Sequence, residues 1–335
     1  MRRDIIAIGA SLGGTEALPR LLSALPPDLD AAVLIVQHMP ADAPSHLPVL
    51  LNRVSSIPAA AAIDGQRLAP GRVYVAVPNR HLMVQDGRIR LTRGPRECFA
   101  RPSIDVLMRS AAYEFGERVI GVVMTGTLDD GTGGLWAIKD RGGLAIVQSP
   151  EEAAFPSMPR NALKHVQVDH VLRIADIAAA ITRLNRESLT GRKARQPNRA
   201  MGAEIRIALG ELAPASDRPG EPSVFTCPDC HGSMFEIREG THSRYRCHTG
   251  HAFGDATLEE RQATAAARAL EEALALLDER EKLIHQAAAF AGKGGKGEDA
   301  ERLAQQAAQV QDLRRRLHEV LETPVVEDNA LRPAG

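Results

Sequence analysis

The sequence predicts an α/β protein with a doubly wound, mainly parallel, Rossmann-like sheet, followed by two smaller elements. Three observations support this prediction. Apolar runs of strand length alternate with helical patterns between residues 5 and 187. Three of the four cysteines lie within residues 227–247, and apolar residues recur at helical spacing from residue 256 onward. We therefore expect a sheet domain, a small cysteine-containing module and a helical hairpin.

The sheet domain is expected over residues 1–187. Its strands are predicted by the apolar runs IIAIGAS, AAVLIVQH, RVIGVVMTG and LAIVQ, with helical patterns between them. Continuous apolar runs of this kind are typical of parallel strands that are covered on both faces. The interposed segments PGRVYVAVPN and HLMVQDGRIRLT, with Asp86-Gly87 as a turn, predict a β-hairpin insertion.

Composition changes along the rest of the chain and predicts its further divisions. Residues 188–223 are rich in Gly, Pro, Ser and Arg, apart from a short apolar stretch, and are expected to form a linker. Residues 224–255 contain the Cys/His cluster and are expected to form a zinc-ribbon-like module. Residues 256–323 carry two apolar stripes separated by GKGGKGED, which predicts a helical hairpin. The tail, residues 324–335, is expected to be disordered.

Length and charge narrow the classes of function. A chain of 335 residues is long enough for more than one hydrophobic core. Its 41 Lys and Arg residues nearly balance 42 Asp and Glu residues, so no overall positive field favours nucleic acid. No apolar run reaches the roughly 18 residues that a membrane span needs, and the N-terminus resembles a strand rather than a signal peptide. We therefore expect a cytoplasmic protein with no nucleic-acid partner and no membrane insertion.

A serine follows the first predicted strand. The segment Gly9-Ala10-Ser11-Leu12-Gly13 matches the G-x-S-x-G pattern of a nucleophile elbow, whose glycines let the backbone turn sharply beside the serine. The free amides at the start of the following helix can stabilise an oxyanion. A dinucleotide fingerprint is the competing interpretation, but Ser11 replaces its middle glycine. A hydrolase is favoured over nucleotide binding, and a purely structural turn remains a third alternative.

A histidine and two aspartates follow other predicted strands. His38 comes directly after the run AAVLIVQ, and Asp129 and Asp130 follow RVIGVVMTG. The carboxyl ends of parallel strands are where α/β sheets build their sites, which makes His38 a candidate partner of Ser11. A lone histidine is more often structural, so both interpretations stay open. Either aspartate is suited to cap the next helix or to orient a histidine.

Six segments carry a resemblance to a known family. They are IAIGASLGGTEAL, VLIVQHMP, LAPGRVYVAVPNRHLMV, RPSIDVLMRSAA, VVMTGTLDDGTGG and PSMPRNAL, and they run in order through the predicted sheet domain. With them the sequence resembles the catalytic domain of the chemotaxis protein-glutamate methylesterase family. Members often read S-T-G-G and T-G-M-G-x-D-G where this chain has Leu12 and residues 125–131 as TGTLDDG. These departures leave the substrate preference open.

The resemblance implies a Ser11, His38 and Asp130 triad, with Asp129 as the loop neighbour. It also implies that the backbone amides of Leu12 and Thr127 bind the oxyanion. The implied reaction is hydrolysis of glutamate methyl esters through an acyl-enzyme, and members commonly deamidate glutamine as well. The implied partner is a methylated chemoreceptor or a similar signalling protein.

Two further expectations follow from the resemblance. The first predicted strand begins at Ile5, so the phosphorylatable receiver domain that precedes many such catalytic domains is expected to be absent from this chain. Activity is then expected to be independent of phosphodonors. The alternative function is a scaffold, in which a catalytically silent esterase fold binds a partner through the cysteine module and the helices.

The cysteine module has the spacing of a metal site. Cys227 and Cys230 form a C-x-x-C pair, and Cys247 and His251 form a C-x-x-x-H pair. Three thiolates and one imidazole suit tetrahedral Zn²⁺, and a filled shell predicts a structural rather than a catalytic ion. His248 and His231 compete for the fourth position, and the C-x-x-x-H spacing favours His251.

The apolar stripes of the two predicted helices must be buried. Leu270, Leu274 and Leu277 mark the first stripe, and Leu303 and Val310 begin the second. Such stripes bury against each other, against the sheet domain, or in a dimer. A homodimer through the C-terminal helices is therefore one expected assembly.

Overall fold

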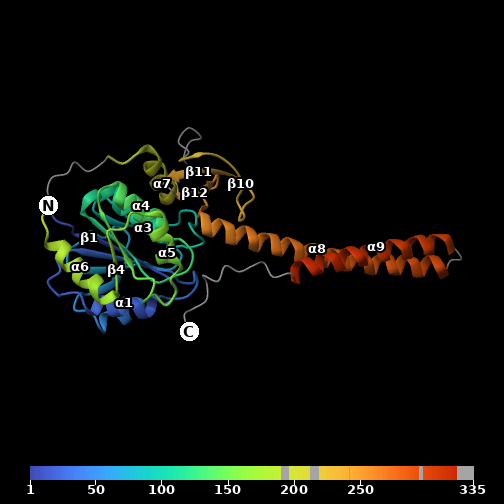
Figure 1. The fold of residues 1–335 in the computed structure, drawn as a ribbon, viewed down its shortest axis with the longest axis horizontal. Helices are drawn as coiled ribbons and strands as arrows, with labels where there is room; N and C mark the ends of the chain where they lie inside the picture. The colour runs from blue at the N-terminus through green and yellow to red at the C-terminus, as the bar shows by residue number, and fades with distance from the viewer. Residues whose placement is uncertain (190–195, 212–218, 241, 294–296, 323–335) are drawn as a thin grey trace. The chain divides into compact units, whose positions relative to one another are not determined.

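The computed structural model describes residues 1–189, 196–211, 219–240, 242–293 and 297–322 (Figure 1). They divide into two compact units. The first contains Met1–Leu258, and the second contains the described residues from Glu259 onward. In the described part of the chain, no helix is both long enough and apolar enough to span a membrane.

A seven-stranded sheet forms the centre of the first unit (Figure 1). Its strand order is β3-β4-β2-β1-β7-β8-β9, and all its neighbouring strands pair in parallel. The predicted doubly wound parallel sheet is therefore confirmed. Because the chain continues outward on both sides of β1, the carboxyl ends of β1 and β7 flank the topological switch point. The strands are β1 (Ile5–Ala10), β2 (Ala32–Gln37), β3 (Ala59–Ala61), β4 (Arg72–Val75), β7 (Val119–Val123), β8 (Leu144–Gln148) and β9 (His170–Leu172).

Helices cover both faces of this sheet because successive strand residues point to opposite sides. Ile6 and Ile8 of β1 share a core with α1, α2 and α6, whereas Ile5 and Ala7 share a core with α3, α4 and α5. The helices are α1 (Gly14–Ser23), α2 (Leu47–Asn52), α3 (Ile104–Phe115), α4 (Thr132–Asp140), α5 (Ser157–His165) and α6 (Ile174–Arg186), with a short 3-10 turn at Gly116–Arg118. The buried strands and two-sided cover explain the continuous apolar runs of the sequence.

The predicted β-hairpin insertion is confirmed for residues 81–92, as β5 (His81–Gln85) and β6 (Arg88–Thr92). The segment PGRVYVAVPN, which was expected to belong to the insertion, instead contains β4, which pairs in parallel with β2 and β3 of the seven-stranded sheet. Asp86 and Gly87 form its turn, and both have positive φ angles. The segment expected to be a linker differs from the prediction, because Arg199–Leu209 forms helix α7. This helix begins at an Asn198 cap, and Thr92 of β6 donates a hydrogen bond to the Ala208 carbonyl. The Gly, Pro, Ser and Arg content of the segment had indicated a linker, although the segment contains an amphipathic helix.

The cysteine module contains a four-stranded antiparallel sheet of order β10-β11-β12-β13. This sheet belongs to the same compact unit as the seven-stranded sheet, rather than to a domain of its own. The expected division at residues 224–255 therefore does not mark a separate compact unit. Its strands are β10 (Glu221–Thr226), β11 (Ser233–Glu239), β12 (His242–Cys247) and β13 (Ala252–Gly254).

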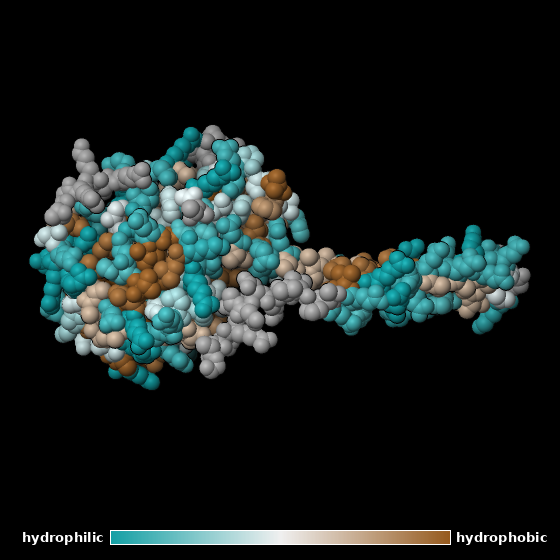
Figure 2. Space-filling view, in the orientation of Figure 1, coloured by the Kyte–Doolittle hydropathy of each residue, from teal (hydrophilic) through white to brown (hydrophobic). Residues whose placement is uncertain are grey.

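The predicted helical hairpin is formed by α8 (Asp255–Lys293) and α9 (Gly297–Glu322). Arg314 of α9 pairs with Asp278 and Glu281 of α8, at 2.5 and 3.1 Å. Hydrophilic residues cover most of the hairpin surface seen in Figure 2. The exposed apolar residues include Leu276, Leu283 and Phe290 of α8 and Leu313 and Val320 of α9. The homodimer stays a prediction, and the tail expected to be disordered lies outside the described residues.

Candidate active site and metal centre

Ser11 is the first residue after β1 and is almost fully buried. Its amide donates to the carbonyl of Thr125, and its carbonyl accepts a hydrogen bond from the Gln37 side chain at 2.8 Å. Gly13, two residues later, has a φ of 79° and precedes α1. This left-handed conformation favours glycine, which explains why the turn of the elbow carries one. The backbone of Ser11 is thereby fixed from both neighbouring strands.

The structure brings Ser11, His38 and Asp130 together. Nδ1 of His38 lies 3.0 Å from the Ser11 hydroxyl oxygen, and Nε2 lies 2.7 Å from Oδ2 of Asp130. When Nε2 carries the proton and donates it to Asp130, Nδ1 is free to accept the serine proton. The imidazole thus lies between a hydroxyl and a carboxylate, which is the arrangement that general-base activation of a serine requires.

Asp130 lies at the N-terminus of α3. Its carboxylate accepts hydrogen bonds from the Ser103 hydroxyl and from the amides of Ile104 and Asp105, at 2.8 to 3.0 Å. Ser103 is itself the N-cap of this helix. The positive end of a helix dipole and three donors stabilise a negative charge at this position. The carboxylate that contacts His38 is therefore fixed in place.

Asp105 makes the reciprocal contact with the helix that follows Asp130. Its Oδ1 accepts from the amides of Gly131 and Gly134, at 2.9 and 2.6 Å, and so caps α4. Burial, together with the nearby Asp130 carboxylate, raises the pKa of Asp105 to about 7. Asp130 thus binds the N-terminus of α3, and Asp105 at the start of α3 binds the N-terminus of α4, which follows Asp130. Asp105, which does not contact His38, is the carboxyl group with the raised pKa.

Asp129 is turned away from His38. Its carboxylate accepts hydrogen bonds from the amides of Ala256 and Thr257 and from the Thr257 hydroxyl, in the first turn of α8. Burial raises the pKa of Asp129, although the hydrogen bonds from Thr257 oppose this effect. Of the two aspartates that the sequence left open, the structure places only Asp130 against the histidine.

The two residues expected to supply oxyanion amides line the same cleft as Ser11. Leu12 and Thr127 both contribute to its wall. Within the described residues, neither backbone amide donates to another protein group. Leu128 has a φ of 65°, and its carbonyl accepts from Asn161 of α5 at 2.7 Å. The loop after β7 is therefore held in a strained conformation by α5.

The cleft above Ser11 has a volume of about 390 Å³. Met39 and Phe99 supply apolar surface, and Arg96 and Arg101 supply positive charge. Cys98 also lines it, but burial raises the pKa of its thiol well above the usual value, so the thiol stays protonated. Ser11 is therefore the candidate nucleophile of this cleft.

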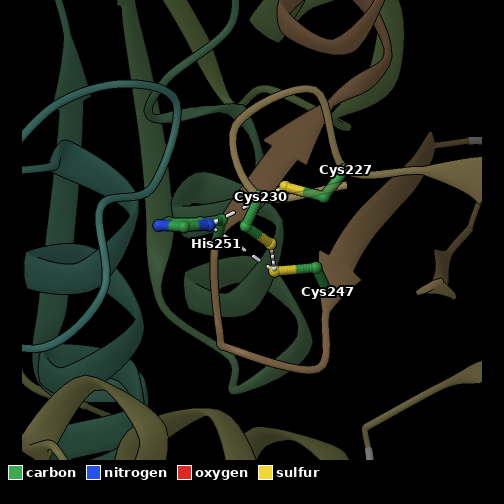
Figure 3. Close-up of side chains that lie close together, drawn as sticks. All are labelled: Cys227, Cys230, Cys247 and His251. Atoms are coloured by element: carbon green, nitrogen blue, oxygen red, sulfur yellow. Dashed lines mark hydrogen bonds between the residues drawn. The ribbon is translucent and has the colours of Figure 1, made fainter. Parts of the chain in front are cut away.

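The side chains of Cys227, Cys230, Cys247 and His251 also converge (Figure 3). The Cys230 and Cys247 sulfur atoms are 3.7 Å apart, and Nδ1 of His251 lies 3.7 Å from the sulfur of Cys227 and 3.6 Å from that of Cys247. A tetrahedral zinc ion with bonds of about 2.3 Å to sulfur and about 2.0 Å to nitrogen needs ligand atoms about 3.5 to 3.8 Å apart. The donor set and these separations fit such an ion.

The competing histidines do not join this group. The cluster of possible ligand atoms, all within 4.8 Å of one another, contains His251 but neither His248 nor His231. Cys227 and Cys247 are buried, whereas Cys230 and His251 are partly exposed. A bound ion would have four protein ligands, which suits a structural site.

Sequence reasoning missed the side chains that hold the candidate triad. Ser103 and Asp105 lie in the segment RPSIDVLMRSAA, and Asn161 lies in PSMPRNAL. A serine directly before an apolar helical pattern is an N-cap signal, and it could have placed a helix N-terminus at this position. Nothing in the sequence indicates that the carboxylate bound there comes from Asp130.

A buried cluster of charges was also missed. It joins the loop before α3, α3 itself, α7 and the four-stranded sheet. Arg246 contacts Glu97 at 2.6 Å and Glu204 at 2.8 Å, and Arg109 contacts the same two carboxylates at 3.1 and 3.2 Å. Burial opposes ionisation of Glu97, but Arg109 and Arg246 outweigh it and lower the pKa of Glu97 to about 2. The buried charge cluster consists of Glu97, Arg109, Glu204, Glu239, Arg244 and Arg246.

Comparison with known proteins covers the seven-stranded sheet and its helices. The family model described as CheB methylesterase matches residues 6–181. A putative protein-glutamate methylesterase/protein-glutamine glutaminase of Leptospira interrogans is 38% identical over 193 residues, which cover 57% of this chain and all of that protein. A protein of similar name from Nitratidesulfovibrio vulgaris is 37% identical, over 53% of this chain and 50% of its own length.

A solved structure agrees with these sequence matches. The catalytic domain of the Thermotoga maritima CheB methylesterase superposes with a TM-score of 0.52 and 30% sequence identity. The superposition covers 54% of this chain and 98% of that domain. The region matched by the family model ends at residue 181, before the four-stranded sheet and the helical hairpin begin.

Proposed function

The chain belongs to the CheB methylesterase family, and on that premise we propose that it hydrolyses methyl esters of glutamate side chains in a chemoreceptor-like protein. The observation that carries the proposal is the position of His38 between Ser11 and Asp130, all three of which line the cleft. The family resemblance of the sequence implies the same three residues. Relatives named methylesterase/glutaminase support the choice of substrate.

The proposed reaction is acyl transfer in two steps. His38 takes the Ser11 proton on Nδ1 while the serine oxygen attacks the ester carbonyl. The amides of Leu12 and Thr127 bind the oxyanion, and Asp130 stabilises the imidazolium. The imidazolium then protonates the methoxide, so that methanol leaves and a glutamyl ester of Ser11 remains.

The second step releases the product. His38 removes a proton from water, which attacks the glutamyl ester and frees the glutamate carboxylate and the serine hydroxyl. A glutamine side chain would give the same acyl-enzyme with ammonia as the leaving group. We propose that deamidation accompanies ester hydrolysis for this reason.

Methanol release from a methylated chemoreceptor preparation tests the function. We expect the full-length chain to release methanol and Ser11→Ala to lose about 10⁴-fold or more of the rate. Ser23→Ala, an exposed serine whose hydroxyl donates to the Arg20 carbonyl, is the matched control. If the unaltered chain releases no methanol and Ser11→Ala still binds a partner, the esterase proposal is wrong and the scaffold alternative is favoured.

We also propose that Cys227, Cys230, Cys247 and His251 bind one structural Zn²⁺. These four residues would hold the ion, and a bound ion would join the segment after β10 to the segment at the end of β12. Elemental analysis of the purified chain should find about one zinc per chain, which Cys230→Ser loses and His248→Ala keeps. An absence of stoichiometric metal would contradict the proposal.

A further inference from the structure

One wall of the cleft is a short segment in an unusual conformation. We call residues 96–101 the rim segment. Arg96, Cys98, Phe99 and Arg101 of this segment all line the cleft. Cys98 and Phe99 have φ angles of 47° and 63°, so two consecutive residues with side chains are left-handed. Such conformations are costly and persist only where surrounding structure holds them.

The surrounding structure is the turn that carries His251. The amide of Cys98 donates to the Ala252 carbonyl at 2.8 Å, and the amide of Ala252 donates to the Arg96 carbonyl at 3.3 Å. The next residue, Phe253, packs its ring edge-on against Phe99, with the centroids 5.7 Å apart. The residue that follows a candidate metal ligand thus makes both backbone hydrogen bonds to the rim segment.

The rim segment and the metal cluster also share a small hydrophobic core. Phe99 and Cys230 pack against Cys227, Cys247 and Phe253 in this core. Immediately before Cys247, Arg246 binds the Glu97 carboxylate. The rim segment is therefore connected to the metal cluster through hydrogen bonds, ring packing and an ion pair.

We propose that the metal bound by the four ligands positions the substrate cleft. By fixing the 247–251 turn, the ion holds Ala252 and Phe253 where they keep the rim segment in its left-handed conformation. Ala252 and Phe253 are then positioning residues that act through Cys98 and Phe99. This inference rests on the proposed esterase function and deepens it, because it makes substrate binding depend on the metal.

The triad and the rim segment have different supports, so the two should respond differently to metal loss. Ser11 is held by Thr125 and Gln37, and Asp130 by the N-terminus of α3. None of these contacts involves residues of the 247–251 turn. Metal loss should therefore raise KM for a protein substrate while leaving the intrinsic reactivity of Ser11 nearly unchanged.

The experiment compares the full-length chain with Cys230→Ser, and with chelator-treated chain before and after zinc chloride is added back. Hydrogen–deuterium exchange followed by mass spectrometry reports on the rim segment. We expect its amides to exchange about 10-fold faster without metal and to recover with zinc. KM for the methylated receptor should rise about 10-fold, whereas labelling of Ser11 by a small fluorophosphonate should change less than about 2-fold.

Two further variants keep the test decisive. His248→Ala changes a histidine of the same turn that is outside the metal cluster, and it should alter neither exchange nor KM. Phe253→Leu keeps all four ligands and removes the ring contact with Phe99. This variant should retain zinc and still raise KM. It therefore tests the contact even if Cys230→Ser unfolds the four-stranded sheet.

The outcomes separate this inference from the proposed function. Unchanged exchange in the rim segment after metal loss would overturn the inference, and so would faster exchange with unchanged KM. If the unaltered chain releases no methanol, the esterase proposal fails. In that case the rim segment's exchange, with and without zinc, still decides whether the metal holds the cleft wall.

Discussion

Asp129 and Asp130 are adjacent in the chain, yet their carboxylates bind the N-termini of two different helices. Asp130 accepts from the first amides of α3, and Asp129 accepts from amides in the first turn of α8. Since Asp130 also contacts His38, one aspartate belongs to the candidate triad and its neighbour attaches the start of α8 to the same loop.

Exchanging each aspartate for asparagine should separate these two roles. Asp130→Asn should lower kcat by about 10⁴-fold, because the amide cannot stabilise the imidazolium. Asp129→Asn should leave kcat within a few-fold and lower the free energy of unfolding by about 1 kcal/mol, as loss of a helix cap does. Steady-state kinetics and urea unfolding of both variants give the comparison. Equal kinetic damage by the two changes would refute the assignment of Asp130.

The nucleophile and base should be equally indispensable. We expect His38→Ala to lose about as much activity as Ser11→Ala, because residues of a triad act as a unit. The double variant should be no worse than either single variant. Rates of methanol release for the three proteins test this, and additive losses would mean that His38 does not act through Ser11.

Asp105 should make stability depend on pH. Its pKa is raised from 3.8 to about 7, so the folded chain binds this proton more tightly than the unfolded chain does. Its contribution is fully present below about pH 4, falls as pH rises to about 7, and is then constant. Asp105→Asn should remove this decline, which has a slope of up to about 1.4 kcal/mol per pH unit. Urea unfolding of both proteins at several pH values between 4 and 8 measures the difference. Parallel pH profiles for the two proteins would contradict the raised pKa.

The sequence predicted the parallel sheet because continuous apolar runs are a local pattern. Continuous apolar runs indicated parallel strands, and the positions of Ser11 and His38 at strand ends placed them at one edge. The choice between Asp129 and Asp130 came from the family resemblance, because a carboxylate's direction depends on which helix N-terminus it meets. Only the folded chain shows that α8 begins beside Asp129.

The linker prediction was wrong because it relied on composition. Gly, Pro and Arg on both sides concealed α7, and the burial of Glu204 within it has no local signal. This carboxylate is buried because Arg109, Arg244 and Arg246 converge on it from elements far apart in the sequence. Contacts of this kind depend on tertiary packing, which periodicity does not encode.

The buried charge cluster should be sensitive to the loss of any one member. Arg244 contacts Glu204 and Glu239, so Arg244→Met leaves buried carboxylates without their partner. We expect a loss of about 3 to 5 kcal/mol in the free energy of unfolding. Arg183→Met is the control, because its exposed pair with Glu187 is worth at most about 1 kcal/mol. Urea unfolding that gave equal losses would show that the cluster is not tightly coupled.

The buried charge cluster spans the border between the region that this chain shares with its relatives and the rest of the compact unit. The inherited unit that this chain shares with its relatives is matched over residues 6–181, whereas the compact unit continues to Leu258. Glu97 and Arg109 lie inside the inherited unit but are buried with Arg246, which lies outside it. The region shared with relatives and the compact unit therefore end at different residues of this chain. A gene fragment cut at the homology border would encode a recognisable esterase sequence whose interior had become part of its surface.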